Sequence, residues 1–278
     1  MLLSRPAIRR AVAVIAAIGV SALAAACGSG GVSSSGSATA TTAPAAATAS
    51  SHSIAVAPAD RSAPTVLAAA SLTKVLPAID PGARFSFGGS GALATQIEQG
   101  APADVYAAAG PKSPAMLRQK GLIDPPVVFA TNTLVIIVPK RNPAHIRSVS
   151  DITKPGIKIV ICNATVPCGD YARTAFMNLG ITRKAMKNVV SQTTDVTQTV
   201  AEVATGQADA GFVYFTDARA ANGKVAVVRL PAAAKPGTQD LIAVVKKAPH
   251  PGAAKAFLAM VLSARGRAKL QAAGFGKP

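Results

Sequence analysis

The sequence has few of the residues that catalysis and metal binding use most. It contains three histidines and three cysteines among 278 residues. His52 lies in a stretch of small and polar residues, and His145 and His250 lie in the proline-flanked stretches NPAH and APHP, which are typical of surface loops. No histidine pair stands at helical spacing, and no phosphate loop of the type glycine, four residues, Gly-Lys is present. We therefore expect a protein that is not an enzyme and that has no cofactor and no metal cation ligands.

One serine motif keeps an enzymatic alternative open. GGSGA around Ser90 is similar to a nucleophile elbow, although that motif needs glycine at the position of Ala92. An exported α/β enzyme with Ser71 or Ser90 as its nucleophile would also need a histidine base, which the sequence does not visibly supply.

The charge is strongly positive. Lys and Arg number 29 against 12 Asp and Glu, for a formal net charge of +17. The basic residues are scattered and are not interleaved with aromatic residues, so we expect no nucleic-acid partner. We expect a solvated basic surface with mild long-range attraction of anions. A basic surface lipoprotein that binds an anionic polymer is the alternative from another class.

The N-terminal segment has the layout of an export signal. Three arginines precede an apolar run that ends in small residues and is too short for a comfortable membrane span. Residues 1–26 are therefore predicted to be a signal peptide. LAAAC resembles a bacterial lipobox with its leucine displaced by one place, which predicts that Cys27 is lipidated and anchors the exported protein to the cell membrane; ordinary cleavage nearby is the alternative. Residues 27–62 are small and polar, and we expect a flexible tether.

The other two cysteines, Cys162 and Cys168, flank the short stretch NATVP. Outside the cytoplasm a disulfide is the usual state of such a pair. A metal site would need further ligands, and a redox motif would have two intervening residues. We expect a structural disulfide, with free thiols as the alternative.

From residue 63 onward, strand-like and helix-like segments alternate. Strands are predicted over residues 65–71, 84–87, 104–110, 133–140, 157–162, 210–215, 224–230 and 240–247. Helices are predicted over residues 91–99, 112–120, 171–179 and 195–205, and residues 252–273 are predicted to be one long helix or a broken pair. This alternation predicts an α/β fold with largely parallel sheets.

Several of these strands run into the start of a helix. A helix start presents unpaired N–H groups and a partial positive charge, and so it can bind an anion. TVLAAASL leads to Ser71, and RFSFGGSGAL leads to Ser90. Serine at such a place caps its helix or turns its hydroxyl to a bound oxyanion.

Three more segments of this kind follow in the second half. PCGD, with Cys168, follows a strand and precedes a helix. Thr194 or Asp195 is expected to cap the next helix, which places Val196 in its first turn. The strand AGFVYF ends at Tyr214, whose phenol is a hydrogen-bond donor, and the following helix is expected to begin at Thr216 or Asp217.

The segments AAASLTKVLPAI, FSFGGSGALATQIEQGAPADVYAAAG, NTLVIIVPK and GFVYFTDA resemble, in this order, the molybdate-binding protein of bacterial ABC importers. The resemblance covers essentially all of residues 63–275, and SGALATQIEQGAPADVY is its most specific part. It implies a two-lobed periplasmic-binding-protein fold of type II, in which each lobe is a mostly parallel sheet flanked by helices and the ligand lies in the cleft between the lobes. Residues 63–136 plus 244–278 would form lobe 1, and residues 137–243 would form lobe 2.

The resemblance also implies an oxyanion site of five residues. Ser71 and Ser90 would each give a hydroxyl and a backbone N–H from lobe 1. In lobe 2, Cys168 and Val196 would give backbone N–H groups and Tyr214 its hydroxyl. Several neutral donors in a closed, dry cleft can hold a dianion. Such a site has no acceptor for the proton of hydrogen phosphate.

The implied function is the capture of molybdate or tungstate outside the cytoplasm and its delivery to the membrane permease of an ABC importer, by closure of a monomer around the anion. Molybdate, tungstate and sulfate have the same charge and geometry, so a receptor for another tetrahedral oxyanion such as sulfate is the nearest alternative. The family often has serines where Gly89 and Gly91 flank Ser90, so this chain would have fewer hydroxyl contacts.

Overall fold

The computed structural model describes residues 63–234 and 236–278. The expected signal peptide, the lipidation site Cys27 and the expected tether lie outside these residues. Among the helices of the described residues, none is long and apolar enough to span a membrane.

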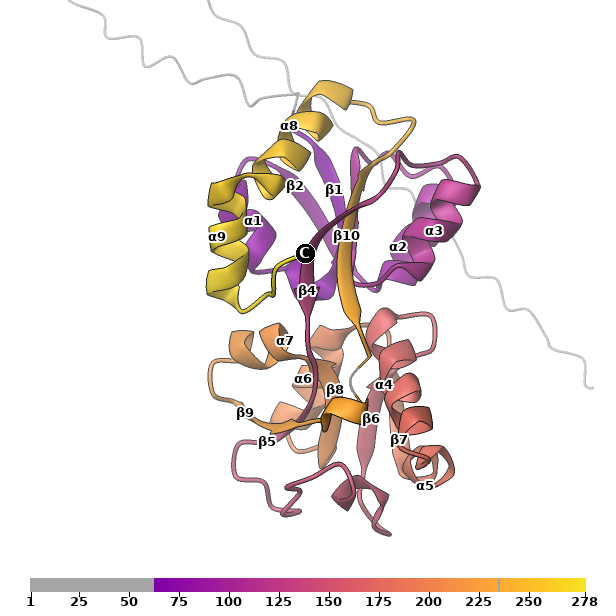
Figure 1. Cartoon of the computed structure of the whole chain (residues 1–278), viewed down its shortest axis with the longest axis vertical. Coiled ribbons are helices and arrows are strands. Elements are labelled where there is room, and N and C mark those ends of the chain that lie inside the picture. Colours follow the sequence, from indigo (N-terminus) through magenta and orange to yellow (C-terminus); the bar gives the residue numbers. More distant parts are fainter. Residues whose placement is uncertain (1–62, 235) are drawn as a thin grey trace, which may run out of the picture. The chain divides into compact units, whose positions relative to one another are not determined.

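Two five-stranded sheets form the framework (Figure 1). The first has the strand order β2-β1-β3-β10-β4, and the second has the order β7-β6-β8-β5-β9. The strands of the first sheet are β1 (Thr65–Ala69), β2 (Arg84–Gly88), β3 (Val105–Ala108), β4 (Val127–Asn132) and β10 (Thr238–Val244). Those of the second are β5 (Leu134–Pro139), β6 (Ile159–Cys162), β7 (Val189–Thr193), β8 (Ala210–Tyr214) and β9 (Val225–Arg229).

The two sheets share one pattern of strand directions. In each, the first three strands of the order are parallel, and the fourth is antiparallel to both of its neighbours. The predicted α/β fold with mostly parallel sheets is therefore confirmed.

Helices cover the sheets on both sides. Figure 1 shows α1, α8 and α9 together on one side of the first sheet and α2 and α3 on the other, while α4 and α5 lie apart from α6 and α7 in the second. The helices are α1 (Val75–Ile79), α2 (Ser90–Glu98), α3 (Lys112–Gln119), α4 (Pro167–Asn178), α5 (Thr182–Lys187), α6 (Val196–Ala204), α7 (Phe215–Ala220), α8 (Pro251–Leu262) and α9 (Ala264–Ala273). Short 3₁₀ helices are η1 (Ala70–Leu72), η2 (Asp151–Thr153) and η3 (Ala232–Ala234).

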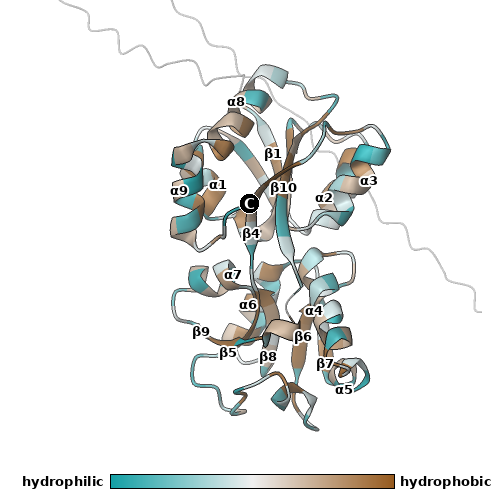
Figure 2. Cartoon of the chain, viewed as in Figure 1, coloured by the Kyte–Doolittle hydropathy of each residue, from teal (hydrophilic) through white to brown (hydrophobic). Residues whose placement is uncertain are grey.

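The position of a strand in its sheet explains its sequence. The central strands β3, β6 and β8 are buried throughout, because helices cover both of their faces. At the edges, β7 and β9 alternate between more and less buried residues. Figure 2 accordingly shows apolar central strands between helices that carry hydrophilic residues.

The structure corrects several predicted elements. It has β4 and β7, which were not predicted, and α4 begins at Pro167 rather than at Tyr171, because proline suits the first turn of a helix. The C-terminal helical segment is a broken pair. Ser263 makes the break, since its Oγ accepts a hydrogen bond from the Gly266 N–H at 3.0 Å and caps α9.

Two passages of the chain connect the sheets. β4 continues into β5 through Asn132 and Thr133, and β10 returns to the first sheet at Thr238. The Asn132 N–H donates to Thr238 Oγ1 at 3.0 Å, so the two passages are bonded to each other. The lobe boundaries expected from the sequence, 136/137 and 243/244, fall inside β5 and at the end of β10. We propose to divide the lobes at the strand ends instead.

Candidate anion-binding site

The strand register brings Ser71 and Ser90 to the same edge of the first sheet. β1 and β2 are parallel neighbours in which Ala69 lies opposite Gly88, and each serine follows its strand by two residues. β1 also has β3 on its other side, so the chain reverses its direction of winding here. Open α/β sheets bind their ligands at the carboxyl ends of the strands at such a point.

The two serines differ in their hydrogen bonds. Ser90 is the first residue of α2 and is buried; its Oγ accepts a hydrogen bond from the Ala109 N–H at 3.2 Å, and its carbonyl accepts one from the Tyr106 hydroxyl at 2.7 Å. Ser71 lies in η1, and its Oγ is buried without a hydrogen-bond partner among the described residues. An unpartnered buried hydroxyl costs roughly 1–3 kcal/mol, so the Ser71 hydroxyl is a donor that a bound anion would satisfy.

The second sheet repeats this arrangement. β6 has β7 and β8 as parallel neighbours, with Cys162 opposite Thr193. α4 and α6 begin after β6 and β7, and they place Cys168 and Val196 in their first turns, both buried. The N–H groups of a first turn have no acceptor within their own helix.

The structure shows which residue caps α6 and where α7 begins, for each of which the sequence left two candidates. Asp195 caps α6, with its carboxylate accepting a hydrogen bond from the Gln198 N–H at 3.0 Å. α7 begins at Phe215, and not at Thr216 or Asp217 as expected, because Tyr214 itself is the cap and its N–H donates to Asp217 Oδ2 at 3.0 Å.

Tyr214 joins the two sheets. Its side chain is buried at the end of β8, and its hydroxyl donates to the carbonyl oxygen of Ala109 at 3.0 Å. Because the N–H of Ala109 donates to Ser90, one residue holds both predicted ligand groups. Sequence reasoning did not identify Ala109 as part of the site, although it predicted a strand over DVYAAAG, which contains Ala109. The sequence alone does not show that this strand lies beside β1.

The start of α2 lies directly against the loops that precede α4 and α6. A Cβ atom added to Gly89 would lie 2.5 Å from the carbonyl oxygen of Thr194, and one added to Gly91 would lie 2.5 Å from that of Thr165. Three helix starts therefore meet at one place. Beside them, a cavity of about 220 Å³ is lined by Ser71 and Lys74 from one sheet's connections and by residues of α6 and α7, including Asp217.

Burial sets the protonation of the groups around the site. The pKa of Asp217 is raised to about 7, because burial, together with the smaller effect of the charge of Asp195, outweighs the hydrogen bond from the Tyr214 N–H that lowers it. Burial, and then the charge of Asp240, hold the pKa of the Tyr214 phenol well above its ordinary value. The phenol is therefore a neutral hydrogen-bond donor at any physiological pH.

Cys162 and Cys168 form a disulfide in the structure, with their Cα atoms 6.0 Å apart. The bridge joins the last residue of β6 to the first turn of α4. It therefore lies directly beside one of the predicted N–H donors.

The histidines take no part in this site. His145 is exposed, as expected. His250 is partly buried, contrary to expectation, because its N–H and its ring nitrogen Nδ1 contact the Asp104 carboxylate at 2.6 and 3.1 Å. Within residues 63–234 and 236–278, no cluster of three or more His, Cys, Asp or Glu side chains is placed to hold a metal ion.

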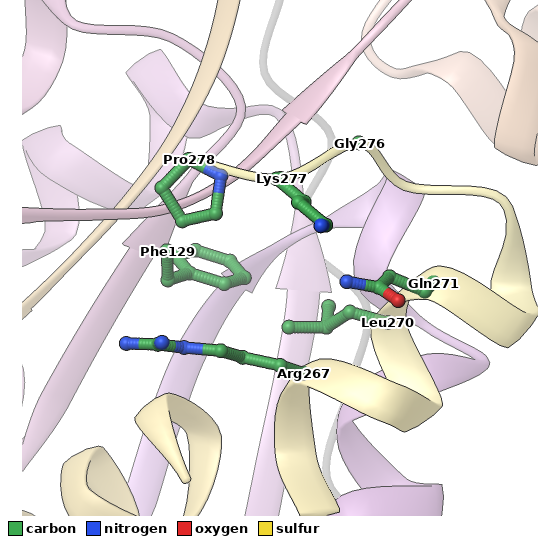
Figure 3. Close-up of a pocket in the computed structure, with 7 residues that line it drawn as sticks. All are labelled: Phe129, Arg267, Leu270, Gln271, Gly276, Lys277 and Pro278. Atoms are coloured by element: carbon green, nitrogen blue, oxygen red, sulfur yellow. The ribbon is translucent and has the colours of Figure 1, made fainter. Parts of the chain in front are cut away.

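A second cavity lies away from the five predicted residues. Figure 3 shows its lining, with the Phe129 ring and the Arg267 side chain near the C-terminal residues. Its volume is about 500 Å³, and its lining residues are Phe129, Arg267, Leu270, Gln271, Gly276, Lys277 and Pro278. None of the helix starts described above contributes to it, so it does not serve the anion site.

Two lobes joined by paired strands, with helix starts from both lobes meeting at one donor-rich place, define a binding protein for a small anion. The chain matches the family of bacterial extracellular solute-binding proteins over residues 64–276. It is 43% identical over 223 residues to the molybdate-binding protein ModA of Mycobacterium tuberculosis, covering 77% of this chain and 84% of that protein.

Solved structures of related proteins have a similar fold. The substrate-binding domain of a putative molybdenum ABC transporter from Clostridium difficile shares 31% identity with a TM-score of 0.57, covering 77% of this chain and 98% of that one. The periplasmic molybdate-binding protein of Azotobacter vinelandii, at 23% identity, shows the same fold with a TM-score of 0.67 over 77% of this chain and 99% of that one. The chain belongs to the bacterial extracellular solute-binding proteins, in the same family as the ModA proteins.

Proposed function

We propose that this protein captures molybdate outside the cytoplasm and delivers it to the permease of an ABC importer. The observation that carries the proposal is the hydroxyl of Ser71, which is buried without a partner among the described residues and lines a cavity together with residues of α6 and α7. The names of the 43% identical relative and of the 31% identical structure support molybdate as the ligand. Tungstate, which has the same charge and shape, is proposed as a second ligand.

Each lobe would supply part of the anion's shell. Ser71 and Ser90 would donate their hydroxyls and backbone N–H groups from the first lobe. Cys168 and Val196 would donate N–H groups, and Tyr214 its hydroxyl, from the second. In the structure Ser90 Oγ accepts a hydrogen bond from the Ala109 N–H, which leaves the Ser90 hydroxyl proton free to be donated to an anion. The Tyr214 hydroxyl donates its single proton to the Ala109 carbonyl and would turn it to the anion when the ligand binds.

Closure of the two lobes would complete the shell. The anion would first meet the serines of one lobe, and the paired passages at Asn132 and Thr238 would then allow the lobes to close around it. The closed form would be the one that the permease recognises. We further propose that the protein acts as a monomer without enzymatic activity, anchored through a lipid on Cys27.

Calorimetric titration of the purified protein with molybdate, tungstate, sulfate and phosphate tests the proposal. We expect saturable 1:1 binding of molybdate and tungstate and no binding of phosphate. At a hundredfold excess over its dissociation constant, the ligand should stabilise the fold by about 2.7 kcal/mol. Preferential binding of sulfate would overturn molybdate as the ligand while retaining the site. Failure of all four anions to bind would overturn the oxyanion function.

A further inference from the structure

The first turn of α4 is held from two directions. The disulfide ties Cys168 to Cys162 at the end of β6. From the next turn of the helix, Arg173 reaches back with its Nη1, which donates to the carbonyl oxygens of Cys162 at 3.1 Å and of Gly169 at 2.9 Å. Its Nη2 donates to Gln192 Oε1 on β7 at 2.7 Å.

The backbone under these ties has very little free space. A Cβ atom added to Gly169 would lie 2.1 Å from the carbonyl oxygen of Asn163 and 2.2 Å from that of Cys162. Both cysteines are buried, and Cys162 Sγ lies 3.6 Å from the hydroxyl of Thr199 on α6. The bridge thus lies between the first turn of α4 and α6, and the guanidinium joins that first turn to the ends of β6 and β7.

We propose that Cys162 and Arg173 are positioning residues of the oxyanion site, forming with Cys168 a clamp that fixes the first turn of α4 and its N–H donor. The proposal rests on the proposed function. Binding groups must be held to within about 0.5 Å of their productive geometry. Hydrogen bonds of Asn163 hold the loop before α4, and the disulfide and Arg173 hold the first turn that follows it. The residues just before this turn face the start of α2, because a Cβ atom added to Gly91 would lie 2.5 Å from the carbonyl oxygen of Thr165 and one added to Gly89 would lie 3.0 Å from Val166 Cγ2. The clamp therefore also fixes the surface on which the first lobe closes.

Reduction of the disulfide by a dithiol would open the clamp. A dithiol transfers two electrons and two protons to the Cys162–Cys168 bridge; the S–S bond breaks, two thiols form, and the dithiol closes into its own cyclic disulfide. Replacement of both cysteines by serine gives a form of the protein that has no bridge and does not respond to the dithiol.

The test compares molybdate binding by calorimetry and stopped flow for the wild type, the double variant Cys162→Ser with Cys168→Ser, and Arg173→Gln. We expect each variant to bind molybdate at least about tenfold more weakly than the wild type. The weaker binding should come from faster dissociation, because a displaced donor destabilises the closed complex and does not slow the encounter. Arg173→Gln keeps the bridge, so it tests the clamp even if the double variant does not fold. When the three substitutions are combined, the losses should be less than additive, since both ties hold one turn.

Asp104→Ala serves as the control for a merely structural effect. Its carboxylate bonds to Thr65 and His250, at the end of β1 opposite to the one that leads to Ser71, so the substitution should lower stability and leave the molybdate affinity of the folded protein unchanged. If the wild type binds molybdate but the clamp variants bind within twofold of it, or if Asp104→Ala loses as much affinity as they do, the clamp proposal is wrong and the proposed function stands. If the wild type binds none of the four oxyanions, both proposals fail together.

Discussion

Tyr214 donates a hydrogen bond from its hydroxyl to the carbonyl oxygen of Ala109 at 3.0 Å. This bond joins the second sheet to the first, and the N–H of Ala109 bonds in turn to Ser90. A residue with no functional side chain thus contacts two groups of the proposed site, one from each lobe, in the present arrangement of the lobes. These two groups are positioned by backbone atoms rather than by charged side chains.

Tyr214→Phe should weaken molybdate binding about tenfold or more. The substitution removes the hydroxyl that would turn from the Ala109 carbonyl to the anion, and in the ligand-free arrangement it leaves the buried Ala109 carbonyl without this partner. Calorimetric titration measures the loss. Thr205→Val, which removes a hydroxyl near the exposed end of α6, is the control and should bind like the wild type. Equal affinity of Tyr214→Phe and wild type would remove Tyr214 from the site.

Ser71→Ala should separate stability from binding. The Ser71 hydroxyl is buried without a partner among the described residues, so its removal should leave the free energy of unfolding of the ligand-free protein unchanged or raise it by up to about 1 kcal/mol. The same substitution should weaken molybdate binding about tenfold. Urea unfolding measures the free energy of unfolding, and calorimetry measures the molybdate affinity. Ser86→Ala, at an exposed position of β2, is the matched serine control. Loss of stability without loss of affinity would contradict this role.

Gly91→Ala should impair closure of the lobes. The added Cβ would lie 2.5 Å from the carbonyl oxygen of Thr165 in the present arrangement, a distance at which the two lobes must separate. We expect the molybdate affinity to fall at least tenfold while the ligand-free protein stays folded. Gly100 is the contrasting position, because nothing lies within 4 Å of an added Cβ, although its φ of +86° makes alanine strained. Gly100→Ala should therefore lower stability and leave affinity unchanged.

The sequence alone predicted the fold class, most strands and the cap of α6, because these depend on local apolar runs and on capping residues, but it placed the starts of α4 and α7 one to four residues too late. β4 and β7 escaped prediction, since VVFATN and VVSQT are strands only by virtue of their neighbours in the sheets. The meeting of Gly89 with Thr194 could not be predicted either, because it depends on how two separate sheets are joined. The role of Asp104 depends on a partner 146 residues away.

Stability should fall as the pH rises through the range in which Asp217 titrates. Burial raises the pKa of Asp217 to about 7, above the value of 3.8 for an ordinary aspartate. Between about pH 4 and 7 the folded protein therefore keeps a proton that the unfolded chain has lost. The free energy of unfolding should decrease by up to about 1.4 kcal/mol per pH unit in this window and not change further above it. Burial raises the pKa of Asp240 too, which adds a contribution of the same sign.

Asp217→Asn tests this assignment, since an amide oxygen can still accept the hydrogen bond from the Tyr214 N–H. Urea unfolding should show a smaller difference in the free energy of unfolding between pH 5 and pH 8 for the variant than for the wild type. At pH 8 the variant should be more stable than the wild type. Glu202→Gln, at a half-buried position of α6 whose side chain accepts a hydrogen bond from Ser191 Oγ, is the control and should keep the wild-type pH dependence. An unchanged pH dependence in Asp217→Asn would show that another group titrates.

Asp104→Ala should destabilise the protein by about 2–4 kcal/mol. The buried carboxylate accepts hydrogen bonds from the Thr65 N–H at 2.7 Å and the His250 N–H at 2.6 Å, which ties the start of β1 to the start of α8. Burial alone would raise the pKa of Asp104, but these hydrogen bonds and the contact with the His250 ring together lower it. The stabilisation is therefore present above the ordinary carboxylate pKa and is lost as the pH falls through the lowered value of the folded protein. Urea unfolding at pH 7 and at pH 3 should show a large difference between wild type and variant at the higher pH and a smaller one at the lower. A difference that is the same at both would mean that Asp104 acts through packing and not through its charge.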